Sequence, residues 1–89
     1  MERDARVEYS RKFLKQAAKL PLRIIDEAQD KELIFKTNLF DSRLRTHKLH
    51  GKEKELWAFW ISHSYRIKFA FLEKGRVLFL EIGTHEIYK

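Results

Sequence analysis

Three apolar runs near the carboxyl end, separated by very short connections, constrain the fold of this chain more than any other feature. The runs are LWAFWIS (56–62), YRIKFAFL (65–72) and RVLFLEIG (76–83). Aromatic and branched residues favour strands, and the connections are only two residues (63–64) and three residues (73–75) long. Connections this short join antiparallel neighbours. The sequence therefore predicts a three-stranded antiparallel meander.

The amino-terminal half predicts one further strand followed by two helices. RVEYS (6–10) alternates charged and apolar residues, as a short strand with one buried face does. Ser10 suits the N-cap of a helix over 11–19, and Pro21 ends that helix and suits the start of a second one over 22–37. A break this short predicts an antiparallel helical hairpin.

Together these elements predict an α+β fold with the order β-α-α-β-β-β. In it, a helical hairpin packs on one face of a largely antiparallel four-stranded sheet, and the other face is left open. The chain has 89 residues, a length that predicts a single domain over 1–89.

The charge balance favours a polyanionic partner. The net charge is +6, from 19 Lys and Arg against 13 Asp and Glu, and the isoelectric point is about 9.7. Nucleic acid or an acidic protein fits such a balance, although solubility alone also explains it. The chain has no cysteine, which excludes disulfides, Cys-based zinc sites and a thiol nucleophile.

Nothing in the sequence predicts a membrane partner. No apolar run approaches the roughly 20 residues that a membrane-spanning helix needs. The opening MERDARVEYS is charged throughout, so we expect no secretory signal. These features predict a cytoplasmic protein.

Alternation along the middle strand of the meander predicts which side chains face the helices. The apolar parity set is Tyr65, Ile67, Phe69 and Phe71. The opposite parity places Arg66 and Lys68 on the open face, where a chain of nucleotides fits. In the last strand, the predicted core residues are Leu78, Leu80 and Ile82. Val77 and Phe79 are also apolar, which suggests that part of the open face is covered.

A basic loop and the carboxyl end both converge on this open face in the predicted fold. The loop RLRTHKLHGK (43–52) holds four Arg or Lys and two His and no carboxylate, and it leads into the strand next to Arg66. His85, Tyr88 and Lys89 follow the last strand. Imidazoles, a guanidinium, a phenol and an ammonium on one surface are the groups that metal-free RNA cleavage needs.

Simpler interpretations apply to the same residues. The four histidines at 47, 50, 63 and 85 suggest a metal site, but the loop lacks helical spacing and few carboxylates flank it. His63 suits a solvated turn, and Arg66 and Lys68 suit ordinary exposed strand positions. Trp57 and Trp60 have opposite parity, so one of them should face the open surface. There it could stack on a base, cover the core or contact a partner, and the sequence does not decide between these roles.

In order along the chain, these segments resemble the RelE/ParE superfamily of bacterial type II toxins, and most of all its RelE/StbE and YafQ-like mRNA interferase branch. The matching features are an HKL-x-G loop, an aromatic strand, YRI-x-F, a short acidic or glycine turn, an apolar strand and a terminal IGTHEIY. The β-α-α layout before them also matches, so the resemblance spans nearly all of the chain.

The resemblance implies a RelE-like toxin that cleaves mRNA in the ribosomal A site, beside the 16S rRNA. A small cognate antitoxin would neutralise it in a toxin–antitoxin hetero-oligomer. The family mechanism uses no metal, no other cofactor and no covalent intermediate. It leaves a 2′,3′-cyclic phosphate or 3′-phosphate and a 5′-hydroxyl.

The same resemblance implies roles for individual residues. Arg66 matches a strand arginine that contacts the scissile phosphate, and His85 matches an imidazole that serves as general acid or base. His47 falls in the loop near the phosphate, and Tyr88 falls near a tyrosine that stacks or assists proton transfer. These four are the predicted catalytic residues. The predicted RNA contacts are Arg43, Arg45, Lys48, His50, Lys52, His63, Lys68 and Lys89.

The sequence leaves the general base and the function class open. YafQ-like members have a carboxylate next to the histidine that His63 matches, and here there is none; other branches carry a glutamate in the second strand, which LWAFWIS lacks. The alternatives to an endoribonuclease are a ParE-like inhibitor of DNA gyrase and a catalytically decayed module that binds antitoxin or nucleic acid.

Overall fold

The structure, a computed structural model, describes residues 5–88 of the chain. In chain order, its elements are β1 (Arg6–Tyr9), α1 (Arg11–Ala17), α2 (Leu22–Thr37), β2 (His47–Lys48), β3 (Trp57–Trp60), β4 (Arg66–Phe71) and β5 (Arg76–Gly83). Short 3-10 turns also form at Ser42–Leu44, at Gly51–Glu53 and at His85–Tyr88. The second of these is called the loop turn below, and the third the C-terminal turn. Within the described part, no helix is long and apolar enough to cross a membrane.

The strands form one five-stranded sheet in the order β1-β5-β4-β3-β2. β1 runs parallel to β5, and the other neighbours are antiparallel. The predicted α+β class and the largely antiparallel meander are confirmed, but the prediction of four strands is wrong. The fifth strand is His47–Lys48, which pairs with Trp57 and Ala58 at the free edge of β3. Two residues are too short to give a periodic signal, so the sequence pattern predicts only a loop there.

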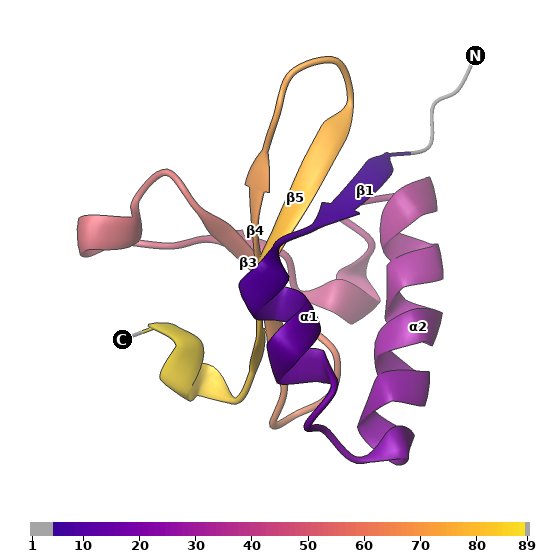
Figure 1. Ribbon diagram of the computed structural model, residues 1–89. Coiled ribbons are helices and arrows are strands. Elements are labelled where there is room, and N and C mark those ends of the chain that lie inside the picture. Colours follow the sequence, from indigo (N-terminus) through magenta and orange to yellow (C-terminus); the bar gives the residue numbers. More distant parts are fainter. Residues whose placement is uncertain (1–4, 89) are drawn as a thin grey trace.

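The helices and the sheet enclose a core of phenylalanines. Phe35 of α2 is fully buried, and its ring centroid lies 4.8 Å from that of Phe59 and 5.0 Å from that of Phe69. Phe79 of β5 completes this cluster at 5.4 Å from Phe35. Figure 1 shows α2 on one side of the sheet, and the loop turn and the C-terminal turn on the other. The second face of the sheet is therefore only partly open.

α1 lies along β5 at the point where β1 ends and leaves β5 without a neighbouring strand. The Ser10 hydroxyl caps α1 by accepting from the Phe13 amide at 2.9 Å, and it donates to the Leu80 carbonyl at 2.7 Å. The side-chain oxygen of Gln16 accepts from the Ile82 amide at 2.9 Å. These side chains satisfy backbone groups that the edge of β5 would otherwise leave unpaired.

A β-bulge in β5 changes which side chains reach the core. Phe69 pairs with Phe79 and Lys68 with Glu81, so Leu80 is the extra residue. Core side chains along β5 are consequently Val77, Phe79 and Ile82. The predicted core set of Leu78, Leu80 and Ile82 is wrong except for Ile82, because unbroken alternation does not anticipate the bulge. In β4 the predicted core residues Ile67 and Phe69 are buried, whereas Phe71 is 45% exposed at the strand end.

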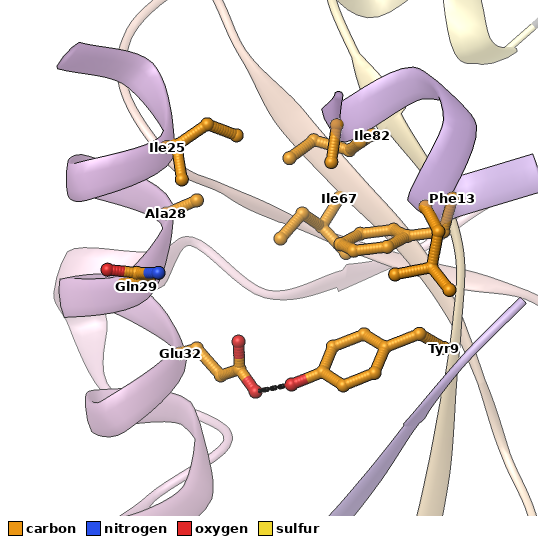
Figure 2. A pocket seen from close by; sticks show the side chains of 10 residues that line it. Tyr9, Phe13, Ile25, Ala28, Gln29, Glu32, Ile67 and Ile82 are labelled. Atoms are coloured by element: carbon orange, nitrogen blue, oxygen red, sulfur yellow. Dashed lines mark hydrogen bonds between the residues drawn. The ribbon is translucent and has the colours of Figure 1, made fainter. Parts of the chain in front are cut away.

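A hollow remains between α1 and α2 on the helix side of the sheet (Figure 2). Its lining is mainly apolar and includes Phe13, Ile25 and Ile82. Tyr9 reaches across its mouth, and its hydroxyl donates to the Glu32 carboxylate. Burial and this bond to a carboxylate raise the pKa of Tyr9. No predicted site residue lines this hollow, so the chemistry must be sought on the other face.

Candidate functional site

Trp60 anchors the basic groups on the second face of the sheet. Ala58 and Trp60 of β3 alternate with Trp57 and Phe59, which pack against the core. Trp60 therefore faces away from the helices. The Cζ atom of Arg66 lies 3.9 Å from the centre of its ring, and that of Arg45 lies 4.7 Å from it. The indole thus holds two guanidinium groups on this face by cation–π attraction.

Arg66 is fixed from two directions. Its Nη1 donates to the carbonyls of Ser62 at 3.0 Å, His63 at 2.8 Å and Tyr65 at 3.3 Å, so the hairpin turn before β4 grips one end of the guanidinium. Its plane stacks on Trp60. Within residues 5–88, Nε and Nη2 make no hydrogen bond of ordinary geometry. They are the donors that remain available to a phosphate oxygen.

Arg66 and His85 line one hollow. Its other lining residues are His63, Ser64 and Thr84, and its volume of about 460 Å³ is in the range of small-ligand sites. Arg66 pairs with Gly83 across β4 and β5, which brings the start of the C-terminal turn beside it. The His85 side chain is 73% exposed, and its Nε2 lies 4.0 Å from a Glu86 carboxylate oxygen. The predicted proximity of the strand arginine and the terminal imidazole is thus present.

A second hollow lies over β2. His47, Lys48 and His50 line it, together with Glu53 of the loop turn and Tyr88 of the C-terminal turn. His47 Nδ1 lies 2.8 Å from the Arg45 carbonyl. A carbonyl only accepts, so Nδ1 carries the proton of this bond, and the neutral ring then has its lone pair on Nε2.

Tyr88 lines the second hollow and also interacts with Arg66 of the first. Its ring lies perpendicular to that of His47 at 6.3 Å between centroids. Its hydroxyl oxygen is buried and lies beside the Arg66 guanidinium, outside the geometry of an ordinary hydrogen bond. Burial raises the pKa of Tyr88, and the charge of Arg66, a hydrogen-bond interaction with its guanidinium and the charge of Lys68 only partly oppose this. The phenol therefore stays protonated at neutral pH.

The prediction that Lys68 stands on an open face is wrong. The residue is only 2% exposed, because the loop turn and the C-terminal turn cover it. Its Nζ donates to Glu53 Oε2 at 2.7 Å, to Glu81 Oε2 at 2.9 Å and to the Ile87 carbonyl at 2.7 Å. Burial by itself lowers the pKa of Lys68, but the bonds to Glu53 and Glu81 outweigh it and raise the pKa. Lys68 is therefore a buried cation, unavailable for RNA contact.

Several other predicted RNA contacts lie away from both hollows. Arg43 donates through Nε and Nη2 to the Asp41 carboxylate at 2.9 and 3.0 Å and sits beside α2 residues, away from both hollows. Lys52 is exposed on the loop turn and lines neither hollow. Arg45 reaches the face through Trp60. Lys89 lies outside the described residues.

The described part of the chain does not gather enough ligand side chains for a metal site. Between residues 5 and 88, there is no cluster of three or more His, Asp or Glu side chains that could hold a metal ion. The histidines divide between the two hollows: His47 and His50 line one, and His63 and His85 line the other.

The sequence patterns missed the carboxylates on this face. Glu53 and Glu81 meet at Lys68, although they lie far apart in the sequence. A signal was present, because Lys68 stands between apolar residues in the inner strand of a meander, where a lysine needs anionic partners. The pattern does not say which carboxylates these are.

Comparison with solved structures identifies the fold. A YoeB/ParE toxin from Agrobacterium tumefaciens has a TM-score of 0.76 at 14% identity and covers 90% of this chain and 98% of its own. YafQ in the E. coli DinJ-YafQ toxin-antitoxin complex has a TM-score of 0.75 at 17% identity, covering 94% and 96%. The archaeal RelE-RelB complex from Pyrococcus horikoshii gives 0.74 at 15% identity, covering 92% and 96%.

No family model and no curated protein sequence matches this chain. The structural likeness extends over nearly the full length of both chains in each comparison. The chain therefore has the RelE-like fold of RelE/ParE type II toxins, as the sequence resemblance predicts. Two of the similar chains were crystallised in complex with their partners.

Proposed function

We propose that this protein is the toxin of a type II toxin–antitoxin system and a ribosome-dependent mRNA endoribonuclease. One observation supports this most strongly: the guanidinium of Arg66 and the imidazole of His85 line a common hollow beside the hollow of His47 and Tyr88. A phosphate ligand and proton carriers in these two hollows suit cleavage of RNA by its own 2′-hydroxyl.

His47 acts as the general base. With Nδ1 donating to the Arg45 carbonyl, the lone pair on Nε2 takes the proton of the 2′-hydroxyl. The freed 2′-oxygen attacks the adjacent phosphorus, and a pentacovalent phosphorane forms. Arg45 helps indirectly, because its backbone is in the left-handed region at φ 51° and directs its carbonyl to the ring.

Arg66 stabilises the charge that develops on the phosphorane. The turn carbonyls leave its Nε and Nη2 unbound, and the anchored Nη1 and the stacked plane hold these donors in place before substrate binds. Such preorganised donors contribute roughly 10²–10³-fold to a rate. Lys48 adds positive charge at the rim of the second hollow.

His85 acts as the general acid. The bond from phosphorus to the 5′-oxygen breaks, and that oxygen takes a proton from the imidazolium of His85. The His85 side chain is 73% exposed, so its ring can reach the leaving oxygen. The products are a 2′,3′-cyclic phosphate and a 5′-hydroxyl. Tyr88 stays protonated and so acts as a hydrogen-bond donor or a stacking surface, not as the base.

Two partners follow from this function. The net charge of +6 suits approach to the mRNA and 16S rRNA of the ribosomal A site. The same charge suits an acidic, partly disordered antitoxin segment that folds on binding. DinJ-YafQ is a toxin-antitoxin complex, which supports a cognate antitoxin for this chain.

Regulated expression in bacteria without antitoxin tests the proposal. We expect growth arrest and mRNA breaks that primer extension maps to fixed positions within codons. His85→Ala and Arg66→Ala should relieve the arrest while the protein stays folded. Arg23→Gln, which removes an exposed charge on α2 that lines neither hollow, should leave it intact.

Two results would overturn the assignment. Full toxicity of both the His85 and the Arg66 variants would refute the active site. Induction of the SOS response with intact mRNA would identify the protein as a gyrase inhibitor, and RNA binding without cleavage at any ribosome concentration would identify a binding module.

A further inference from the structure

The second face is formed by two short segments that lie far apart in the sequence. His47 lies on β2 before the loop turn, whereas His85 and Tyr88 belong to the C-terminal turn. β2 contributes only two residues to the sheet, and each turn is three or four residues long. Elements this short do not hold their positions by backbone pairing alone.

Lys68 contacts both of these segments at once. Its three ammonium protons have three acceptors: Glu53 in the loop turn, the Ile87 carbonyl in the C-terminal turn and Glu81 in the neighbouring strand. Each distance is below 3.0 Å, and the side chain is 3% exposed. A fully satisfied buried ammonium has one arrangement, because any displaced partner would leave a charge or a donor unpaired.

The anchor of this cluster is rigid. Lys68 pairs with Ala58 on one side and with Glu81 on the other, in the middle of the sheet. Glu81 Oε1 also lies 3.3 Å from Gln16 Nε2 and 3.4 Å from Lys12 Nζ, which ties the carboxylate to α1. The position of the ammonium is therefore set by the sheet and α1, independently of the two segments that it holds.

We propose that Lys68 is a positioning residue that aligns the His47 loop with the His85–Tyr88 turn around Arg66. This inference rests on the proposed RNA cleavage for its consequence but on the cluster alone for its geometry. Lys68 does not touch the RNA; it acts through Glu53 on the base side of the site and through the Ile87 carbonyl on the acid side.

Three variants separate this role from general stability. Glu53→Ala removes the tie to the loop turn and leaves Lys68 paired with Glu81 and Ile87. The triple variant Lys68→Met, Glu53→Gln, Glu81→Gln removes both ties without leaving orphan charges in the interior. Lys12→Met is the matched control, because it removes a lysine from the same Glu81 carboxylate but touches neither segment.

The imidazole carbon–proton resonances provide a readout that needs no activity. We expect Glu53→Ala to shift the His47 signal and leave that of His85, and the triple variant to shift both. Lys12→Met should shift neither His47 nor His85. Unchanged His47 and His85 signals in the folded triple variant would overturn the inference, as would an unchanged His47 signal in Glu53→Ala.

Kinetics on programmed ribosomes supply the second readout. We expect the Glu53 and triple variants to lower the single-turnover cleavage rate about 10- to 100-fold, while the half-saturating ribosome concentration changes less than about twofold. Equal rates for wild type, Glu53→Ala and the triple variant would overturn the inference. If the wild type itself cleaves nothing, the proposed function fails, and the resonance shifts still decide whether Lys68 aligns the two segments.

Discussion

At the scale of single residues, Arg66 shows how a surface side chain becomes a fixed part of a site. Three backbone carbonyls bind one of its nitrogens, and the indole of Trp60 supports its plane. An arginine in solution would lose rotamer freedom on binding phosphate, whereas this one has already lost it on folding. The side chain's neighbours, not its charge alone, suit it to the proposed role.

Arg66→Lys tests whether geometry or charge matters. The lysine keeps the charge but has neither the planar fork nor the stacking surface. We expect the cleavage rate to fall about 100-fold. We expect the free energy of unfolding to fall by about 1–2 kcal/mol, because the cation–π contact and the bonds to the turn carbonyls are both weakened. Single-turnover assays and urea unfolding measure the two. A lysine variant with wild-type cleavage would show that any cation suffices.

Tyr88→Phe tests the buried phenol beside Arg66. Removing a buried hydroxyl whose contact with Arg66 lies outside ordinary hydrogen-bond geometry costs little and relieves a desolvated group. We expect the free energy of unfolding to stay the same or to rise by up to about 1 kcal/mol, while the cleavage rate falls if the hydroxyl contacts the RNA. A stability loss above about 1 kcal/mol in urea unfolding would mean that the hydroxyl has a partner in the free protein.

At the scale of elements, the site depends on a β-bulge and on short turns. The bulge at Leu80 places Glu81 opposite Lys68, and Gly83 opposite Arg66 begins the chain's exit into the C-terminal turn. A Cβ added at Gly83 would lie 2.9 Å from Cγ2 of Ile87, which is the residue whose carbonyl binds Lys68. The C-terminal turn therefore packs against β5 at a position where a side chain does not fit.

Gly83→Ala should displace the C-terminal turn. The clash is closer than van der Waals contact allows, so we expect a stability loss of about 1–3 kcal/mol and a shifted His85 imidazole resonance. Ile87→Ala removes the clashing atom, so Gly83→Ala should cost much less in that background. A double-mutant cycle by urea unfolding measures the difference. Equal costs in both backgrounds would show that Ile87 is not the obstacle.

The sequence predicted long elements well and short ones poorly. Apolar patterns located the meander and α2, and the residue type of Ser10 predicted its capping role. Each of these features depends on neighbours in the sequence. It missed β2 and the bulge, which exist only through pairing with a distant strand. The site followed the same division: the proximity of Arg66 and His85 was predictable from strand order, whereas the burial of Lys68 required the tertiary positions of Glu53 and Glu81.

At the scale of the whole molecule, the chain combines a hydrophobic core on one side of the sheet with an ionic core on the other. The phenylalanine cluster lies under α2, and the Lys68 cluster lies under the two turns. The first stabilises the fold at any pH. The second depends on charge, so the face that carries the proposed chemistry should be the more sensitive to acid.

The stability of the protein should fall in acid. Burial raises the pKa of Glu81, but the bonds with Lys68, Gln16 and Lys12 outweigh it, so the pKa lies below its ordinary value of 4.5. As the pH falls, Glu81 is protonated in the unfolded chain before it is protonated in the folded protein. The stability that this carboxylate contributes above about pH 4.5 is therefore lost as the pH falls through the lowered pKa of folded Glu81. The bonds from Arg43 lower the pKa of Asp41 to about 2. Protonation of Asp41 in acid therefore also reduces the stability of the folded protein.

Urea unfolding between pH 3 and 7 measures this dependence. The triple variant that neutralises Lys68, Glu53 and Glu81 should show a weaker fall in acid than the wild type, because the Glu81 carboxylate no longer contributes. An identical acid profile in both proteins would show that the buried cluster does not control acid stability.

The most direct test of the central claim is cleavage of an end-labelled mRNA on purified ribosomes, compared with the same mRNA carrying one 2′-deoxynucleotide on the 5′ side of the mapped break. The account predicts that the wild-type protein cuts the all-ribose mRNA to a 2′,3′-cyclic phosphate and a 5′-hydroxyl and leaves the substituted linkage intact, since the attacking oxygen is missing. Cleavage of both messages at equal rates, or of neither, would contradict it.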